Sequence, residues 1–327
     1  MPARVRRKLP VLTIVLLAVL ATAGAAAAAN GGFTPQTPHS PNAKSINHAY
    51  DLIFILTAAV FVIVETLLVV FIWKYRSRGR GRDVEGPQVH GHTRLELLWT
   101  AGPVLILAVI ATFIFVKLPG IANVPASSAA DRVNITVEAH QFYWQFDYPN
   151  GAKSINDLHV PVNQVVYLTI KSADVDHSWW IPQLGGKTDA IPGRTNHTWF
   201  KVDKIGTFQG QCAEFCGVFH EAMAARVIST SSADYANYIA NVAGTDLGRA
   251  EFQGVCATCH GMQGQGGYGP AIAANPILTQ PQSLAPLLHN GGRVLMPAVG
   301  NDWTDAQIKA LLDYVGKHVY KGATSGG

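Results

Sequence analysis

The stretch Cys212-Ala-Glu-Phe-Cys216-Gly-Val-Phe-His220-Glu-Ala-Met223 decides the fold of this chain. It places two thiols, an imidazole and a thioether within 12 residues. Thiolate and thioether are soft ligands that suit copper, and imidazole suits copper as well. The stretch therefore predicts a metal site, and its second thiolate allows two copper ions to be bridged there.

A second imidazole is needed to complete a symmetric two-thiolate centre. His177 precedes the stretch by 35 residues, lies at the end of a predicted strand and supplies that imidazole. One upstream His with a Cys/His/Met loop is the ligand pattern of a cupredoxin copper site. Two other interpretations stay open: the Cys and His residues of the stretch could share one buried helix face, or the two cysteines could form a disulfide outside the cytoplasm. We favour copper, because the helix leaves Met223 and the surrounding β pattern unexplained.

The sequence around this stretch has the period of a half-buried β-strand. Val133, Ile135 and Val137 alternate with polar residues. Further strands are predicted at 165–170, 198–202 and 224–228, and Gly or Pro turns at 150–151, 185–186 and 192–193. We therefore expect residues 131–230 to form an all-β, cupredoxin-like domain, as a sandwich or a barrel.

The second cysteine pair has a different spacing. Cys256-Ala-Thr-Cys259-His260 is the C-x-x-C-H pattern of covalent c-type haem attachment, in which His260 becomes an iron ligand. A methionine is a common sixth ligand, and Met296 follows a Pro/Gly-rich loop, whereas Met262 is too close to His260 to reach the other haem face. Zinc binding would need a second Cys/His pair, and a thioredoxin-like redox pair would need a βαβ pattern. The sequence provides neither in this region.

The beginning of the chain has the pattern of a secretory signal peptide. A basic start is followed by an apolar run at 9–20 and an alanine-rich stretch that ends near Ala29. We expect residues 1–29 to be a cleaved signal peptide, with a first membrane anchor as the alternative. Residues 30–47 lack apolar periodicity and predict a linker.

Two apolar segments predict a transmembrane hairpin over residues 48–117. The segments 50–73 and 95–116 are each long enough to span a bilayer as a helix. The basic residues between them are Lys74, Arg76, Arg78, Arg80, Arg82 and Arg94. The positive-inside rule places this loop in the cytoplasm, so the rest of the chain lies outside it. A short linker is expected at 118–130, and a linker helix at 231–245 leads to the haem domain at 246–321.

Two acids occupy unusual positions in the hairpin. Glu65 lies in the middle of the first span, where an unpaired charge is costly. It either contacts a partner helix or a proton path, or it is a protonated, hydrogen-bonded acid. Glu96 lies at the cytoplasmic end of the second span, where a helix N-terminus also favours a negative charge.

The composition agrees with an exported membrane protein. The 327 residues are 48% apolar and only 14% charged, against roughly 25% charged in an average soluble domain. The net charge of +4 is too small to suggest nucleic-acid binding. All four cysteines fall in the two close pairs described above, which argues against a disulfide-stapled scaffold.

The chain resembles subunit II of cytochrome c oxidase, fused to a class I cytochrome c domain as in caa-type oxidases. The segments that carry the resemblance are 94–100, 141–144, 176–179, 186–194 and 212–223, with 246–321 for the cytochrome. The resemblance implies a binuclear CuA centre and a magnesium ion at the interface with subunit I. The implied CuA ligands are His177, Cys212, Cys216, His220, Met223 and the backbone carbonyl of Glu214, and the side chain of Glu214 would reach the magnesium.

The resemblance also bears on two further positions. Glu96 aligns with the acid at the mouth of a proton channel, which implies a catalytic role in proton uptake. Phe142 stands where the family usually has Trp, ahead of Tyr143 and Trp144. That Trp is associated with electron transfer from soluble cytochrome c.

The resemblance implies an electron-transfer subunit of cytochrome-c oxidase, a proton-translocating terminal oxidase. Electrons would pass from cytochrome c or a bc-type complex through haem c and CuA to subunit I, which reduces oxygen. The alternative is the corresponding subunit of a CuA-containing nitric oxide reductase. A redox-inactive copper carrier would need neither the haem motif nor Glu96, and quinol-oxidase relatives lack the copper ligands. The expected location is the bacterial inner membrane, as a multi-pass protein with both redox domains on the extracytoplasmic side.

Overall fold

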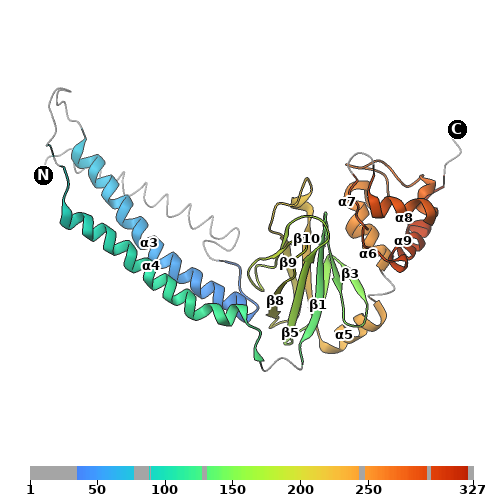
Figure 1. Ribbon diagram of the computed structural model, residues 1–327, viewed down its shortest axis with the longest axis horizontal. Coiled ribbons are helices and arrows are strands. Elements are labelled where there is room, and N and C mark those ends of the chain that lie inside the picture. The colour runs from blue at the N-terminus through green and yellow to red at the C-terminus, as the bar shows by residue number, and fades with distance from the viewer. Residues whose placement is uncertain are drawn as a thin grey trace, which may run out of the picture. The chain divides into compact units, whose positions relative to one another are not determined.

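The computed structural model describes residues 35–76, 88, 90–126, 131–242, 247–292 and 296–322. The chain divides into two units, Met1–Gln36 with Lys44–Ile121, and Thr37–Ala43 with Ala122–Gly327 (Figure 1). The predicted signal peptide, residues 1–29, lies outside the described residues, as does most of the basic loop between the predicted spans.

Two long helices make up the described part of the first unit. Helix α3 spans Pro41–Tyr75 and helix α4 spans Thr93–Ala122. Both are long and apolar enough to cross a membrane, as the sequence predicts. Their large apolar side chains are exposed, with Phe115 82% exposed, which suits a surface that faces lipid or other membrane helices.

Both helices extend beyond the predicted span boundaries. Helix α3 begins inside the predicted linker 30–47, because Pro41 at the first helical position needs no N–H partner and presets the backbone angle. Helix α4 continues to Ala122, inside the predicted linker 118–130, although it contains Pro119. Pro119 is so close to the helix end that little of the helix follows it.

Two five-stranded sheets form the copper-ligand domain of the second unit. The first sheet has the order β3-β2-β1-β5-β8 and the second β4-β10-β9-β6-β7. The strands are β1 Val133–His140, β2 Tyr143–Asp147, β3 Lys153–Ile155, β4 Asp157–Pro161, β5 Val165–Ser172, β6 His177–Trp180, β7 Thr188–Ala190, β8 Asn196–Lys201, β9 Gly206–Cys212 and β10 Ala224–Thr230. The expected all-β, cupredoxin-like domain is confirmed, and the predicted strands correspond to β1, β5, β8 and β10.

Strand β2 shows why the apolar–polar alternation of the sequence predicts only some of the strands. Trp144 and Phe146 point into the core of the sandwich, while Tyr143 belongs to the core of the C-terminal domain. Gln145 is also buried, because it bonds to Gln307 of the same C-terminal domain. A strand that is covered on both faces loses the apolar–polar alternation that marks a half-buried strand.

A short helical segment leads out of the copper-ligand domain. Helix α5 spans Ser232–Asn237, and the Ser231 hydroxyl caps it by accepting a hydrogen bond from the Asp234 backbone. A π-helical turn, Tyr238–Val242, follows. The segment lies against the sandwich, where the Tyr238 ring stacks on His159 at 3.6 Å.

The C-terminal domain is helical in its described residues. Its elements are α6 Leu247–Glu251, the π-helical turn Phe252–Cys256, α7 Ala257–His260, the 3₁₀ turn Pro276–Thr279, α8 Pro281–Asn290 and α9 Asp305–His318. Thr304 and Gln307 form a capping box at the start of α9. Ile308, Leu311 and Val315 are buried, so one face of α9 packs into the core of this domain.

Candidate copper and haem sites

Two strands and the loop between β9 and β10 bring the predicted copper ligands together. His177 is the first residue of β6, and Cys212, the last residue of β9, pairs with Trp179 of β6. The loop after Cys212 carries Cys216, and His220 lies in a short 3₁₀ turn before Met223. The Cys and His residues of the stretch therefore do not share a helix face, and both thiols are free rather than joined in a disulfide.

The donor atoms surround one buried point. The Sγ atoms of Cys212 and Cys216 lie 3.8 Å apart. Cys212 Sγ lies 3.8 Å from His177 Nδ1 and 3.2 Å from the Glu214 carbonyl oxygen. The remaining two donors are His220 Nδ1, 3.5 Å from Cys216 Sγ, and Met223 Sδ, 3.8 Å from the same sulfur.

The two thiols differ in acidity. The pKa of Cys212 is lowered to about 3, first by the hydrogen bond from the Cys216 thiol and also by His177. The pKa of Cys216 is raised, because its proton is held by Cys212 and its thiol is buried. A bound metal ion would displace the thiol protons that remain, because thiolate is the form that ligates a metal. The paired soft sulfurs, flanked by two imidazoles and a thioether, fit copper.

Asp174 accepts a hydrogen bond from the ring nitrogen of His177 that faces away from Cys212. His177 Nε2 donates to Asp174 Oδ1 at 2.8 Å, which directs Nδ1 toward Cys212. Burial opposes ionisation of Asp174, but hydrogen bonds from His177, Val175 and Gln141 outweigh it and lower its pKa. A carboxylate on the far nitrogen fixes the ring of a metal-ligating histidine and raises its basicity.

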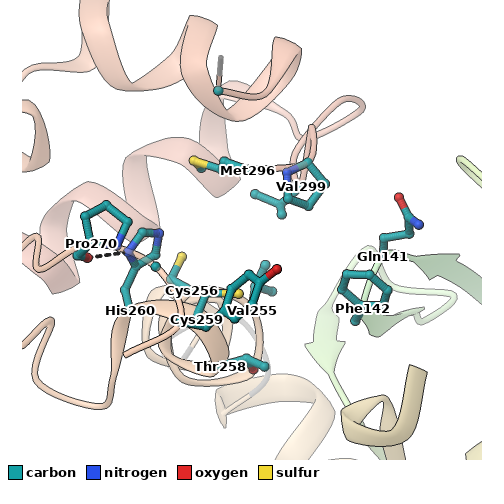
Figure 2. A pocket seen from close by; sticks show the side chains of 14 residues that line it. Gln141, Phe142, Val255, Cys256, Thr258, Cys259, His260, Pro270, Met296 and Val299 are labelled. Carbon is teal, nitrogen blue, oxygen red and sulfur yellow. Dashed lines mark hydrogen bonds between the residues drawn. The ribbon is translucent and has the colours of Figure 1, made fainter. Parts of the chain in front are cut away.

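The haem-motif residues line a partly open, mostly apolar cavity of about 380 Å³. Figure 2 shows His260, Cys256 and Cys259 on one side of it and Met296 on another. His260 Nδ1 donates to the Pro270 carbonyl at 2.8 Å, which leaves Nε2 free for a metal. Met262 is 58% exposed and does not line the cavity, as the sequence suggests.

The cavity fits a covalently bound haem. A Cβ on Gly269 would lie 2.8 Å from the His260 ring, so only glycine leaves the imidazole its place. Burial raises the pKa of the Cys256 thiol to about 12, which keeps this thiol uncharged in an apolar pocket. Within the described residues, Cys256, Cys259 and His260 join no further metal-ligating cluster, and the domain is helical. Neither zinc nor a thioredoxin-like pair is therefore supported.

The copper-ligand domain supplies one wall of the haem cavity. Gln141 and Phe142, in the turn between β1 and β2, line the cavity together with the haem-motif residues (Figure 2). The Gln141 side chain also donates to the backbone carbonyl of Cys216 at 2.6 Å. The Phe142 ring packs edge-on against Phe219 of the copper loop, with centroids 5.5 Å apart. These two residues therefore touch both candidate sites.

A buried polar junction holds the two domains together beside this wall. The Tyr143 hydroxyl donates to the Val299 carbonyl at 2.5 Å and accepts from the Trp303 indole at 2.9 Å. Gln307 Nε2 donates to Gln145 Oε1 at 2.9 Å. All of these side chains are buried. Each named donor has an acceptor, as buried polar groups require.

Sequence analysis did not identify several of these residues as functional. Asp174 precedes the quoted motif around His177 by only two residues, and its position beside a metal-ligating His was the available signal. Gln141 belongs to one of the segments that carry the family resemblance, and the sequence indicates no further role for it. Trp303 lies just before α9, and no sequence pattern connects it with Tyr143, 160 residues away.

The two acids of the hairpin stay predictions. The Glu96 carboxylate accepts from the backbone N–H of His92 at 3.0 Å, which supports the start of α4. Glu65 is exposed in the middle of α3.

The fold and sites define a class of protein: a membrane-anchored redox subunit with a cupredoxin-like domain and a c-type cytochrome domain. Three family models match it. The model described as cytochrome c oxidase subunit II, transmembrane domain, matches residues 28–116, and that of the periplasmic domain matches 152–230. The model described as cytochrome c oxidase, cbb3-type, subunit III matches residues 243–315.

Individual relatives agree with these matches. Cytochrome c oxidase subunit 2 of Alkalihalophilus pseudofirmus is 35% identical over 258 residues, which cover 73% of this chain and 74% of the relative. The same subunit of Cereibacter sphaeroides is 28% identical over 248 residues, or 64% of this chain and 80% of the relative. The solved periplasmic domain of subunit II of the Bradyrhizobium japonicum oxidase is 30% identical, covers 39% of this chain and 99% of that chain, and has a TM-score of 0.33. The chain belongs to the cytochrome c oxidase subunit 2 family, with a fused cytochrome c domain.

Proposed function

We propose that this chain carries electrons from a donor to the catalytic subunit of a haem-copper oxidase, through haem c and a binuclear copper centre. Cys256 and Cys259 would hold the haem covalently, with His260 and Met296 as axial ligands. His177, Cys212, Cys216, His220, Met223 and the Glu214 carbonyl would hold the two copper ions. Both cofactors supply one-electron redox chemistry when bound.

This proposal rests on the turn between β1 and β2, which contacts both the haem cavity and the copper loop. Gln141 and Phe142 line the haem cavity, and Gln141 donates to the carbonyl of Cys216, a proposed copper ligand, at 2.6 Å. A short run of covalent and hydrogen bonds thus joins the two pockets within one chain. Phe142, where the family usually has Trp, lies between two pockets of the same molecule. This position explains why the aromatic residue need not serve a soluble donor here.

The surface around the copper loop supports a partnership with subunit I. Glu214 turns its carbonyl toward Cys212, and its side chain is exposed. Phe215 and Val218 beside it are 77% and 71% exposed. Exposed large apolar side chains around a polar group are typical of a protein interface. We propose that this surface meets subunit I and that the Glu214 carboxylate binds magnesium there.

The hairpin and charge pattern support the proposed location. Basic residues between the two spans place that loop in the cytoplasm, and the redox domains then lie outside it, at the bacterial inner membrane. Glu96, at the cytoplasmic end of α4, is in the place where it could take part in proton uptake. The donor is cytochrome c or a bc-type complex, and the haem domain would receive its electrons.

Optical and metal analysis of the purified complex tests the proposal. We expect two copper ions in this subunit with a near-infrared band, and one covalent haem c by the pyridine haemochrome method. Cys216→Ser should abolish the near-infrared band and keep the haem, while His260→Ala should alter the haem and keep the band. A wild-type complex without the near-infrared band would refute the copper assignment.

Turnover assays distinguish the two activities that the sequence leaves open, oxygen reduction and nitric oxide reduction. The relatives named above are all oxidase subunits, which favours oxygen over nitric oxide as the substrate of the complex. We expect the purified complex to reduce oxygen and to pump protons. Turnover with nitric oxide alone would contradict this assignment.

A further inference from the structure

A second cluster of metal-ligating side chains lies at the junction of the two redox domains. Glu138 and His140 come from β1 of the copper-ligand domain, and Asp302 comes from the loop before α9 of the haem domain. One ligand atom from each lies within 4.8 Å of the others. His140 Nε2 and Asp302 Oδ1 are 3.8 Å apart.

The imidazole of His140 is aimed into this cluster and makes no hydrogen bond through the nitrogen that faces Asp302. The residue is only 1% exposed, and its Nε2 makes no hydrogen bond in the described structure. The ring stacks on Tyr143 with centroids 4.6 Å apart and planes within 3°, which fixes its orientation. A buried nitrogen without a hydrogen bond is destabilising, so a ligand at this position would remove that penalty.

The two carboxylates also gain from a cation. Burial and the neighbouring Asp302 carboxylate raise the pKa of Glu138 to about 7, so the two acids resist being charged together. Lys171, on the adjacent strand, offsets this only weakly. A divalent cation between the acids converts their repulsion into attraction.

The geometry is that of a small site with a nitrogen ligand. A tetrahedral zinc ion with ligands at roughly 2.0–2.2 Å requires ligand atoms about 3.3–3.6 Å from one another. The observed spacing needs only small side-chain movements to reach this. One imidazole with two carboxylates favours zinc over magnesium or calcium, which prefer oxygen ligands. Asp302 is 38% exposed, which leaves a path for the ion and room for a water ligand.

We propose that Glu138, His140 and Asp302 bind one Zn²⁺ ion that joins the haem domain to the copper-ligand domain. The site is separate from the proposed copper and haem sites and uses none of their ligands. It adds a metal crosslink beside the Tyr143–Trp303 hydrogen bond. Because its residues come from both domains, zinc binding and docking of the haem domain stabilise each other.

Zinc content of the holo-complex tests this site. The purified complex is treated with a chelator, equilibrated with ZnCl₂, desalted and analysed by mass spectrometry of its metals. Glu138→Gln and Asp302→Asn are compared with Asp305→Asn, an exposed acid three residues from Asp302. His140→Ala is avoided, because the buried ring supports Tyr143. Unchanged copper and haem contents show that each variant has folded.

We expect one zinc ion that both cluster variants lose and that the Asp305→Asn control keeps. The zinc affinity should fall at least about ten-fold per variant, since even outer-shell substitutions at metal sites cost that much. Zinc-edge absorption should show one imidazole with oxygen ligands and no sulfur. Equal zinc binding in all variants, or a sulfur ligand, would overturn the proposal and leave the copper and haem assignments untouched.

Discussion

Replacing Tyr143 with Phe should undock the haem domain from the copper-ligand domain. The ring of Tyr143 is fully buried, and its hydroxyl bonds to Val299 and Trp303. Tyr143→Phe keeps the ring and its stacking on His140 and removes one oxygen atom. It leaves the Trp303 indole N–H and the Val299 carbonyl without this partner.

The size of the effect follows from these two groups. A buried polar group that loses its partner costs about 1–3 kcal/mol, so the two together give about 2–4 kcal/mol after partial relaxation. At about 1.4 kcal/mol per factor of ten, the docking equilibrium shifts about 30- to 700-fold toward the undocked form.

Hydrogen exchange of the purified chain measures this shift. The segment 296–304, which carries Val299 and Trp303, should exchange faster by that factor in Tyr143→Phe. Tyr148→Phe is the matched control, because its equally buried hydroxyl bonds to Ser154 and to the His159 N–H inside the copper-ligand domain. The control should destabilise the copper-ligand domain. Exchange in 296–304 should become no faster than the loss of global stability in Tyr148→Phe alone explains. Unchanged exchange of 296–304 in Tyr143→Phe would refute the role of this junction.

Three other substitutions test the haem domain and the copper site. Glu251 is buried, and burial raises its pKa to about 9. Between pH 4.5 and 9 the unfolded chain therefore binds fewer protons than the folded chain. The folded state loses stability as the pH rises through that range. Thermal unfolding should therefore show Glu251→Gln gaining on the wild type by up to about 1.4 kcal/mol per pH unit, and a gain that is independent of pH would contradict this. Asp174→Asn should weaken copper binding about 10–100-fold in a competition titration while haem content stays constant; equal affinity would show that Asp174 does not support His177. Gly269→Ala should lower covalent haem content, because its Cβ meets the His260 ring, while Gly316→Ala, whose Cβ meets nothing within 4 Å, should not; equal haem staining would argue against the close fit.

Residues that act through local sequence were predictable. The C-x-x-C-H motif and the Cys212–Met223 stretch each carry several ligands at fixed short spacing, and the structure brings each set together. The capping box of α9 is equally local, because it joins Thr304 to Gln307 only three residues later. Metal coordination by these residues stays a prediction.

Contacts between distant segments could not be predicted in this way. Strand β2 escaped detection because the haem domain covers the face that would otherwise be polar. The pairing of Tyr143 with Trp303 and the approach of Asp302 to His140 depend on how two domains dock, which no periodicity records. The start of α3 depends on one residue, Pro41, whose effect on a helix end lies within the usual error of boundary assignment.

The wall that Gln141 and Phe142 contribute to the haem cavity also sets an order for maturation of the subunit. Covalent attachment must reach the thiols of Cys256 and Cys259, both of which line that cavity. Because Gln141 and Phe142 wall one side of the cavity in the docked arrangement, we expect haem ligation to come first and docking to follow it. The docked domain then lies over the turn whose Gln141 holds the Cys216 carbonyl. In that order, a subunit without haem would keep this side of its copper loop uncovered.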